Sequence, residues 1–250
     1  MTWTNFLVAK IVIYTLYCLK FFKISKLKTF LFYIFCGLSM LSCQTDAVFE
    51  NKDYLPLENG TEALFEIQET VYSLQEPVQK RTYFLKERVA DRQELPNGAF
   101  TCNLETYTTD SPTKNWSLRS ITPIKKQGTS YIFSVNNIEK VLMVQPLTKG
   151  LVWNVNTYNT QKEANVKAVN LGESLTNFNP NWIELAQITF QADSSLLQKN
   201  LFVSYYKNKE GMVYSQLQNL EYCQETPDCI GKKQISYGIE VFKKRISKLP

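Results

Sequence analysis

The sequence predicts a mainly β protein, built as an antiparallel sandwich, an open barrel or a bent sheet, behind an apolar helical leader. Two observations indicate this class. From residue 54 onward, short segments alternate apolar with polar residues, as strands with one buried face do. Turn-forming residues such as Pro96-Asn97-Gly98, Ser111-Pro112 and Gln127-Gly128 separate these segments at intervals of roughly 10 residues.

The predicted strands follow one another closely along the chain. In order, they are 63–72, 81–90, 99–108, 116–124, 130–136, 141–144, 151–158, 183–192, 201–206, 212–222 and 235–246. Segments 201–206 and 212–222 are expected to form a hairpin across 208–211, although Val213, Leu217 and Leu220 also fit a helix. The two helix candidates are 163–169 and a single turn at 194–199.

One short motif occurs twice. Pro56-Leu57-x-x-Gly60 and Pro146-Leu147-x-x-Gly150 each precede an alternating segment. A turn with Pro and Gly at these positions explains each copy by itself. The shared Pro-Leu start and the shared phase also fit two half-domains of similar build, so both interpretations stay open.

The region before residue 44 has the layout of a lipoprotein signal peptide. A basic cluster with Lys20, Lys23, Lys26 and Lys28 precedes an apolar run that ends at Cys43. This run is short for a bilayer span, which takes about 20 residues, and suits an export signal. We therefore predict Cys43 as the lipidation site and the new N-terminus. The alternative is an ordinary apolar anchor helix in which the cysteine is incidental.

Four regions follow from this interpretation. Residues 1–22 form an apolar leader, either a further anchor or sequence upstream of the true translation start. Residues 23–43 form the signal peptide, 44–52 a polar tether, and 53–250 a single β-rich domain. We expect the mature chain to lie in the cell envelope, anchored by its lipid to the outer membrane.

Composition excludes several function classes. The chain has 28 basic and 23 acidic residues, but residues 1–43 hold five of the basic ones and no acidic residue. The mature chain therefore has 23 of each sign, and we expect no nucleic-acid partner. The absence of histidine excludes His-based catalysis and the commonest metal ligand. We expect no catalytic residue, no metal site and no cofactor.

Three cysteines remain after Cys43. Because export exposes the chain to an oxidising compartment, Cys223 and Cys229, on either side of Pro227, are predicted to form a disulfide. Cys102 is then expected to be a buried free thiol on a strand. A bridge from Cys102 to either of the other two stays open on sequence alone.

Several motifs resemble a known family. They are Tyr54-Leu55-Pro56-Leu57-x-x-Gly60, Pro146-Leu147-x-x-Gly150-x-x-Trp153-Asn154, Tyr205-Tyr206…Gly211-Met212-Val213-Tyr214 and Glu221-Tyr222-Cys223…Cys229-Ile230-Gly231…Gly238. Together they resemble uncharacterised lipoproteins of the Bacteroidetes type over most of residues 54–246. The chain departs from the family at Ala63, where the pattern has an aromatic residue. The resemblance implies location and fold, and it brings no established activity.

Three functions are considered. The first is a non-catalytic binding or structural role in the envelope, with another envelope protein, a glycan or a lipid met through exposed Tyr and Trp. The second is a carrier of an apolar ligand or lipid in a half-closed sheet, which requires apolar residues on both faces of the strands. The third, and least favoured, is a carboxylate-based hydrolase.

The side chains available for chemistry are few. Four glutamates at polar strand positions are candidates for a carboxylate pair, but a solvated face with Lys86 and Arg88 as cross-strand partners explains them better. These glutamates are Glu66, Glu69, Glu87 and Glu105. Trp116, Trp153 and Trp182 either line a ligand groove or fill a β core.

Overall fold

The structure is a computed structural model that describes residues 52–247 except 112 and 167. The predicted leader, signal peptide and Cys43 lie outside the described residues, as does all of the tether except its last residue. The described residues all belong to one compact unit. Within the part that the structure describes, no helix is long and apolar enough to cross a membrane.

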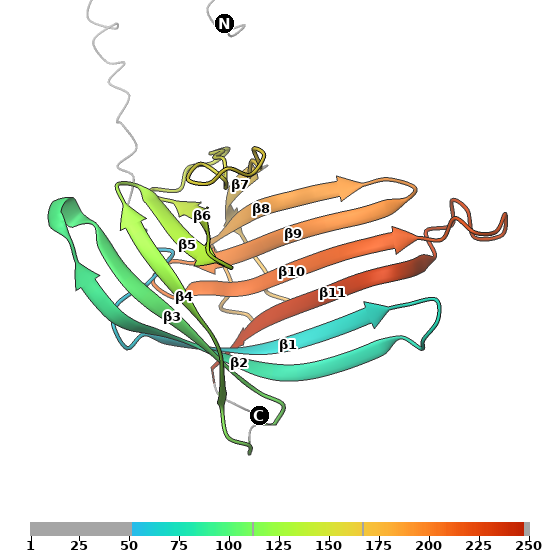
Figure 1. Cartoon of the computed structure of the whole chain (residues 1–250), viewed down its shortest axis with the longest axis horizontal. Coiled ribbons are helices and arrows are strands. Elements are labelled where there is room, and N and C mark those ends of the chain that lie inside the picture. The colour runs from blue at the N-terminus through green and yellow to red at the C-terminus, as the bar shows by residue number, and fades with distance from the viewer. Residues whose placement is uncertain (1–51, 112, 167, 248–250) are drawn as a thin grey trace, which may run out of the picture. The chain divides into compact units, whose positions relative to one another are not determined.

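The described residues form one open sheet of eleven antiparallel strands (Figure 1). The mainly β class is therefore confirmed, as a bent open sheet rather than a two-sheet sandwich. The strands are β1 (Glu62–Tyr72), β2 (Gln79–Glu94), β3 (Phe100–Thr109), β4 (Ser117–Gln127), β5 (Ser130–Val135), β6 (Ile138–Val144), β7 (Ala168–Glu173), β8 (Leu185–Ser194), β9 (Gln198–Lys207), β10 (Gly211–Tyr222) and β11 (Ile235–Ile246). A short 3-10 turn, η1 (Pro96–Gly98), joins β2 to β3.

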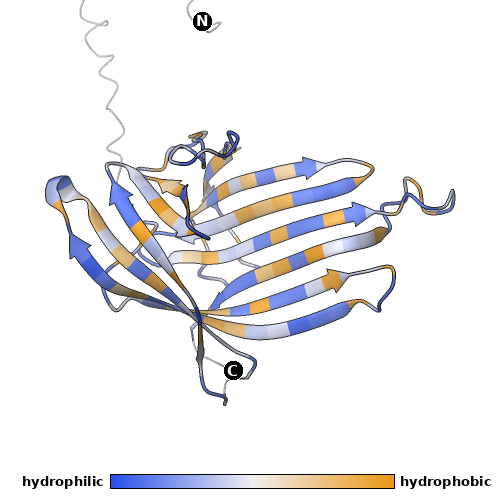
Figure 2. Cartoon of the chain, in the orientation of Figure 1, coloured by the Kyte–Doolittle hydropathy of each residue, from blue (hydrophilic) through white to orange (hydrophobic). Residues whose placement is uncertain are grey.

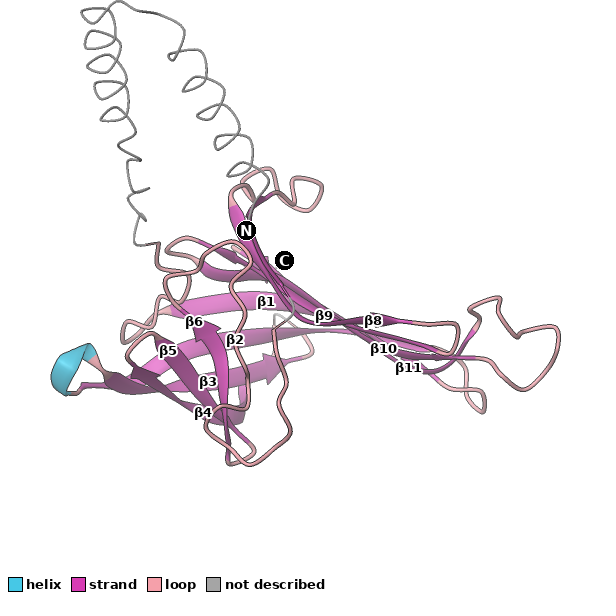
Figure 3. Ribbon diagram, turned by 90° about the horizontal axis from the view of Figure 1, so that it is seen from above, coloured by secondary structure: helices cyan, strands magenta, loops and turns pink. Residues whose placement is uncertain are grey.

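The strand order makes two meanders that meet at the chain's first and last strands. It reads β6-β5-β4-β3-β2-β1-β11-β10-β9-β8-β7, so strands that follow one another in sequence pair with each other, except β6 and β7, which form the two edges, and β1 pairs with β11. The strands β3–β6 turn away from the plane of β8–β11 (Figures 1 and 3). Register shifts in β2, at Ala90/Gln93, and in β8, at Thr189/Gln191, contribute to this bend, because bulges increase local twist.

The segment between β6 and β7 bonds to both edge strands. The amide of Val141 in β6 donates to the carbonyl of Val155 at 2.8 Å, and the amide of Gly150 donates to the carbonyl of Val169 in β7 at 2.8 Å. The indole Nε1 of Trp153 adds a bond to the carbonyl of Val141 at 2.9 Å. This one segment therefore occupies backbone groups on both edges of the sheet, which otherwise invite pairing with another chain.

The largest core cluster lies where the two meanders face this connecting segment and the residues before β1. Apolar and polar blocks alternate along most strands, as the sequence predicts (Figure 2). The buried members of the cluster are Tyr54, Leu57, Val89, Phe100, Cys102, Ile124, Tyr131, Ile132, Val141, Met143, Leu147, Trp153, Val166, Val169, Ala186, Ile188 and Tyr206.

Four local predictions are wrong. Residues 151–158 form turns with a single bridge from Asn154 to Asn165 instead of a strand. Their alternation comes from Trp153 packing in the core, while their backbone bonds go to turns and to β6. The helix candidate 163–169 runs into β7, and the helical turn at 194–199 is the β8–β9 hairpin. Segment 212–222 is strand β10, so its helical alternative is also wrong.

The repeated Pro-Leu-x-x-Gly motif forms the same turn twice. Gly60 donates to the carbonyl of Val89 and Gly150 to that of Val169, both at 2.8 Å. The φ angles of the two glycines are 83° and 77°, a region that favours glycine. Both turns bury their leucine, Leu57 or Leu147, in the same core. After the turns the copies diverge, since the first leads directly into β1 and the second into the turn-rich segment. The structure thus supports the turn interpretation of the motif.

Gly238 lies where strand β11 closely approaches the backbone of β10. Its φ is 134°, and a Cβ there would lie 2.2 Å from the carbonyl oxygen of Asn219 in the adjacent strand β10. Gly231, with φ 76°, has nothing within 4 Å of the same atom position. Gly238→Ala should lower the free energy of unfolding by about 2–4 kcal/mol, because backbone must move. Gly231→Ala should cost only roughly 1 kcal/mol. Urea unfolding measures both, and equal losses would contradict the close approach.

Candidate functional site

Three hairpin loops lie side by side at one end of the central strands. The register pairs Tyr72 with Gly238 and Glu221 with Gln198. This places the loops 73–78, 195–197 and 223–234 next to one another, at the right of Figure 1. We call this end of the sheet the distal end. The opposite end, where residues 52–54 meet the β9–β10 turn, is called the entry end.

The distal loops expose aliphatic side chains. Leu196 and Leu197 in the β8–β9 loop expose 62% and 59% of their surface. Leu74 and Val78 in the β1–β2 loop, and Ile230 in the β10–β11 loop, expose between 43% and 53%. Large apolar side chains that gather at one end of a sheet, on loops that pack little core, are typical of an interaction surface. The distal end is therefore the candidate functional site.

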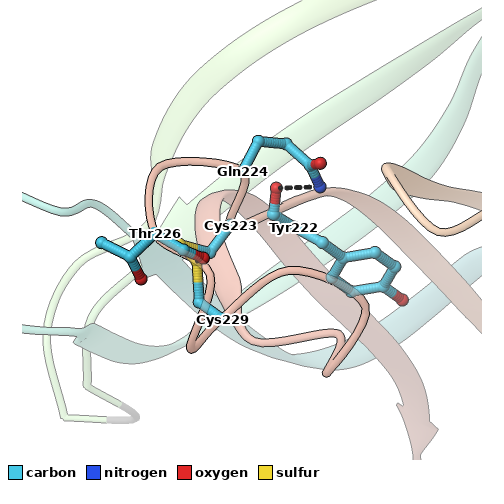
Figure 4. Close-up of a disulfide and its surroundings, with 5 residues drawn as sticks. All are labelled: Tyr222, Cys223, Gln224, Thr226 and Cys229. Atoms are coloured by element: carbon cyan, nitrogen blue, oxygen red, sulfur yellow. Dashed lines mark hydrogen bonds between the residues drawn. A yellow bond between two sulfur atoms is a disulfide. The ribbon is translucent and has the colours of Figure 1, made fainter.

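A disulfide holds the longest of these loops. Cys223 and Cys229 are joined with an S–S distance of 2.08 Å (Figure 4). The side-chain amide of Gln224 donates to the carbonyl of Tyr222 at 3.2 Å. The amides of Cys229 and Ile230 both donate to the carbonyl of Thr226, at 3.1 and 3.2 Å. The bridge and these bonds limit the freedom of the loop and fix the backbone beneath the exposed Ile230 side chain.

A polar cluster ties the strands together just before these loops. The Tyr72 hydroxyl donates to Glu240 Oε2 at 2.7 Å, and the Gln218 amide donates to Glu240 Oε1 at 2.5 Å. These three residues stand on the adjacent strands β1, β10 and β11. The hydrogen bond to Glu240 raises the pKa of Tyr72 to about 12. At neutral pH the phenol is therefore protonated and remains the donor, so the three strands stay linked.

Cys102 lies far from the distal loops, in the core beside strand β4. It is a free, buried cysteine. Burial raises the pKa of its thiol to about 11, and the nearby Arg92 opposes that shift only in part. The thiol is therefore protonated at neutral pH and does not have the thiolate character of a nucleophile.

The three tryptophans do not gather at one end or edge. Trp153 and Trp182 are buried in two separate core clusters. Trp116 is half-buried, with the Lys86 ammonium 5.4 Å from its ring. The exposed surface at the distal end is thus mainly aliphatic, with Tyr237 as its exposed aromatic residue. This surface was not predicted from the sequence. The signal that could have identified it is the Leu196-Leu197 pair between two predicted strands, since turns seldom carry two leucines.

The four candidate glutamates do not form a facing pair. Glu105 lies opposite Arg88 in the register and accepts from its guanidinium at 2.8 Å, as the cross-strand interpretation expected. Glu87 points to the other face and pairs with Lys243 at 2.5 Å. Glu66 accepts from Gln68, and Glu69 stands opposite Arg81. These carboxylates therefore supply no acid and base on two sides of a common substrate position.

Among the residues that the structure describes, no three Asp, Glu, Cys or His side chains are placed to hold a metal ion.

Comparison with known proteins gives one coarse structural likeness. A crystal structure from Bacteroides fragilis NCTC 9343, described as that of an exported protein with a YmcC-like fold, aligns with a TM-score of 0.40. The alignment covers 78% of this chain and 97% of that chain, at 11% sequence identity. No protein-family model and no curated protein matches the chain. A likeness at this level carries no argument about function.

The cysteine arrangement can be checked by thiol counting on a chain of residues 50–250. The folded chain should react slowly or not at all with a thiol reagent at neutral pH, because Cys102 is buried and protonated. Unfolding without a reductant should release one thiol, and unfolding with a reductant should release three. Three thiols before reduction would contradict the Cys223–Cys229 bridge.

Proposed function

We propose that the protein is a lipid-anchored envelope protein that docks to another envelope protein through its distal loops. The observation that carries this proposal is the exposure of Leu74, Val78, Leu196, Leu197 and Ile230 on three loops at one end of the sheet. Such aliphatic groups bind by burial of apolar surface, which needs no catalytic residue.

The position of the entry end supports a partner away from the anchoring membrane. The amide of Asp53 donates to Asn208 Oδ1 at 2.9 Å, which fixes the start of the folded part at the β9–β10 turn. Strand β10 has 12 residues and separates this turn from the distal loops by about 40 Å at 3.3 Å per residue. A tether of residues 44–52 reaches at most about 30 Å. A lipid on Cys43 therefore leaves the distal loops free to face a partner.

The neutral charge of the mature chain fits the same proposal. Its basic and acidic residues balance after Cys43. Contact through aliphatic loops does not depend on a strong surface field, whereas nucleic-acid binding does. The carrier function, with an apolar ligand in the half-closed sheet, is the second candidate. The observation that favours it is a cleft at the entry end, separate from the distal loops.

The anchor is tested by replacing the lipidation site. Cys43→Ser should abolish incorporation of a palmitate label and move the protein from the membrane fraction to the soluble fraction. The lipid supplies the apolar surface that holds the chain on the bilayer. Unchanged membrane association of the variant would instead indicate an anchor helix before residue 43.

The docking surface is tested by cross-linking in whole cells, followed by purification through a C-terminal tag. The unaltered protein should recover one or a few envelope proteins in stoichiometric amounts. The double variant Leu196→Asp, Leu197→Asp should lose them, because burial of two charges opposes docking.

The matched control is Leu118→Asp, Ile121→Asp, which places two charges on exposed apolar positions of β4. This control should recover the same proteins as the unaltered chain. Equal recovery from all three forms would overturn docking through the distal loops. A hydrolytic activity that disappears when a carboxylate is replaced would favour the enzyme.

A further inference from the structure

We infer that a cleft at the entry end binds an anionic amphiphile, with the carboxylate of the ligand on Arg245 and its apolar chain against the core. The cleft has a volume of about 150 Å³. Its apolar walls come from the residues before β1 and from four strands: Leu55, Leu57, Phe65, Val89, Leu104 and Met212. This site is distinct from the distal loops and does not depend on them.

Arg245 is the central residue of the cleft, because its charge has no ion-pair partner among the residues that the structure describes. The guanidinium lies in the wall of the cleft and donates through Nη1 to the backbone carbonyl of Glu210. Among the described residues, no carboxylate lies within ion-pair distance of it. Burial lowers the pKa of Arg245, while the more distant charges of Glu210 and Glu87 oppose that effect. Arginine nevertheless stays protonated, so a positive charge remains in the cleft.

The acidic residues around the cleft already have cations of their own. Glu87 pairs with Lys243 at 2.5 Å, and both side chains are more than four-fifths buried. Lys243 also stands 4.1 Å from the centre of the Phe65 ring. The carboxylate of Glu210 pairs with Lys207 at 2.6 Å.

Two other polar groups line the cleft. Glu62 stands exposed at the rim, opposite Arg88 in the β1–β2 register. Burial raises the pKa of Tyr206, whose phenol is therefore neutral. Among the described residues at the cleft, Glu87 balances Lys243, and the partly buried Arg245 remains a positive charge without an ion-pair partner.

An anionic ligand with an apolar body matches this combination. A partly buried charge without an ion-pair partner costs free energy, and a carboxylate at the guanidinium would offset that cost. The planar fork of arginine fits a carboxylate through two parallel hydrogen bonds. A cavity of this size holds a group about as large as benzene, so a chain of roughly six carbon atoms fills it. A medium-chain carboxylate is the simplest such ligand.

The probe is octanoate, titrated calorimetrically into the full mature protein. We expect saturable binding of one octanoate per chain. Octylamine, with the same chain and the opposite charge, should not bind, and acetate should bind at least tenfold more weakly. Failure of octanoate to bind at millimolar concentration, or equal binding of acetate, would overturn the proposal.

Variants separate recognition from a purely structural role of Arg245. Arg245→Gln should weaken octanoate binding at least tenfold, and Arg245→Lys should restore part of the affinity, because the charge returns without the fork. Arg119→Gln, on strand β4 outside the cleft, should leave the affinity unchanged. Equal octanoate affinity of Arg245→Gln and the unaltered protein would overturn the assignment.

A second variant tests the cleft without touching the arginine. Ala63→Leu adds volume to the wall and keeps every charged group in place. It should weaken octanoate binding by filling the space that the chain occupies. Unchanged affinity would place the ligand elsewhere and overturn the proposal, even if Arg245→Gln failed to fold.

Discussion

The fold depends on the pairing of the first strand with the last. β1 and β11 pair from Leu64 with Ile246 to Tyr72 with Gly238, and this pairing joins the two meanders into one sheet. Pairing two strands so far apart in sequence costs more loop-closure entropy than forming a local hairpin. Aromatic and aliphatic packing beside the pair, with Phe65 and Ile67 almost fully buried, offsets that cost. The β1–β11 register therefore fixes how the residues of one meander lie relative to those of the other.

The register also sets where the two proposed sites lie. Because side chains alternate between faces, a slip of one residue would move Phe65 and Ile67 out of the core and Glu66 into it. The same register aligns the three distal loops at one end and brings Arg245 beside Glu87 and Phe65 at the other. Gly238 lets β10 and β11 approach closely at the distal end. A contact surface and a ligand cleft can therefore stand at opposite ends of one sheet.

The open sheet is protected at its edges by a segment that is not a strand. Residues 145–166 bond to both β6 and β7 and bury Trp153 in the core. This arrangement explains why residues 151–158 look like a strand in sequence. Leu151, Trp153 and Val155 alternate because they pack against the core, but the backbone of the segment makes only isolated bonds to β6 and to residues 164–166, not a ladder. An alternating apolar pattern indicates that one face of a segment is buried. It indicates a strand only where a partner strand completes the hydrogen-bond ladder.

The sequence by itself determined the class of fold and ten of the eleven strands, because alternation and turn residues are local signals. It missed β7, whose first residues fell in the helix candidate 163–169. Only the tertiary structure decided the strand order, which separates Glu87 from Glu105 by placing them on opposite faces. It alone decided that Leu74, Leu196 and Ile230 share one end, and that Arg245 has no acidic partner among the described residues. These facts arise from pairings between residues distant in the chain, which no local pattern contains.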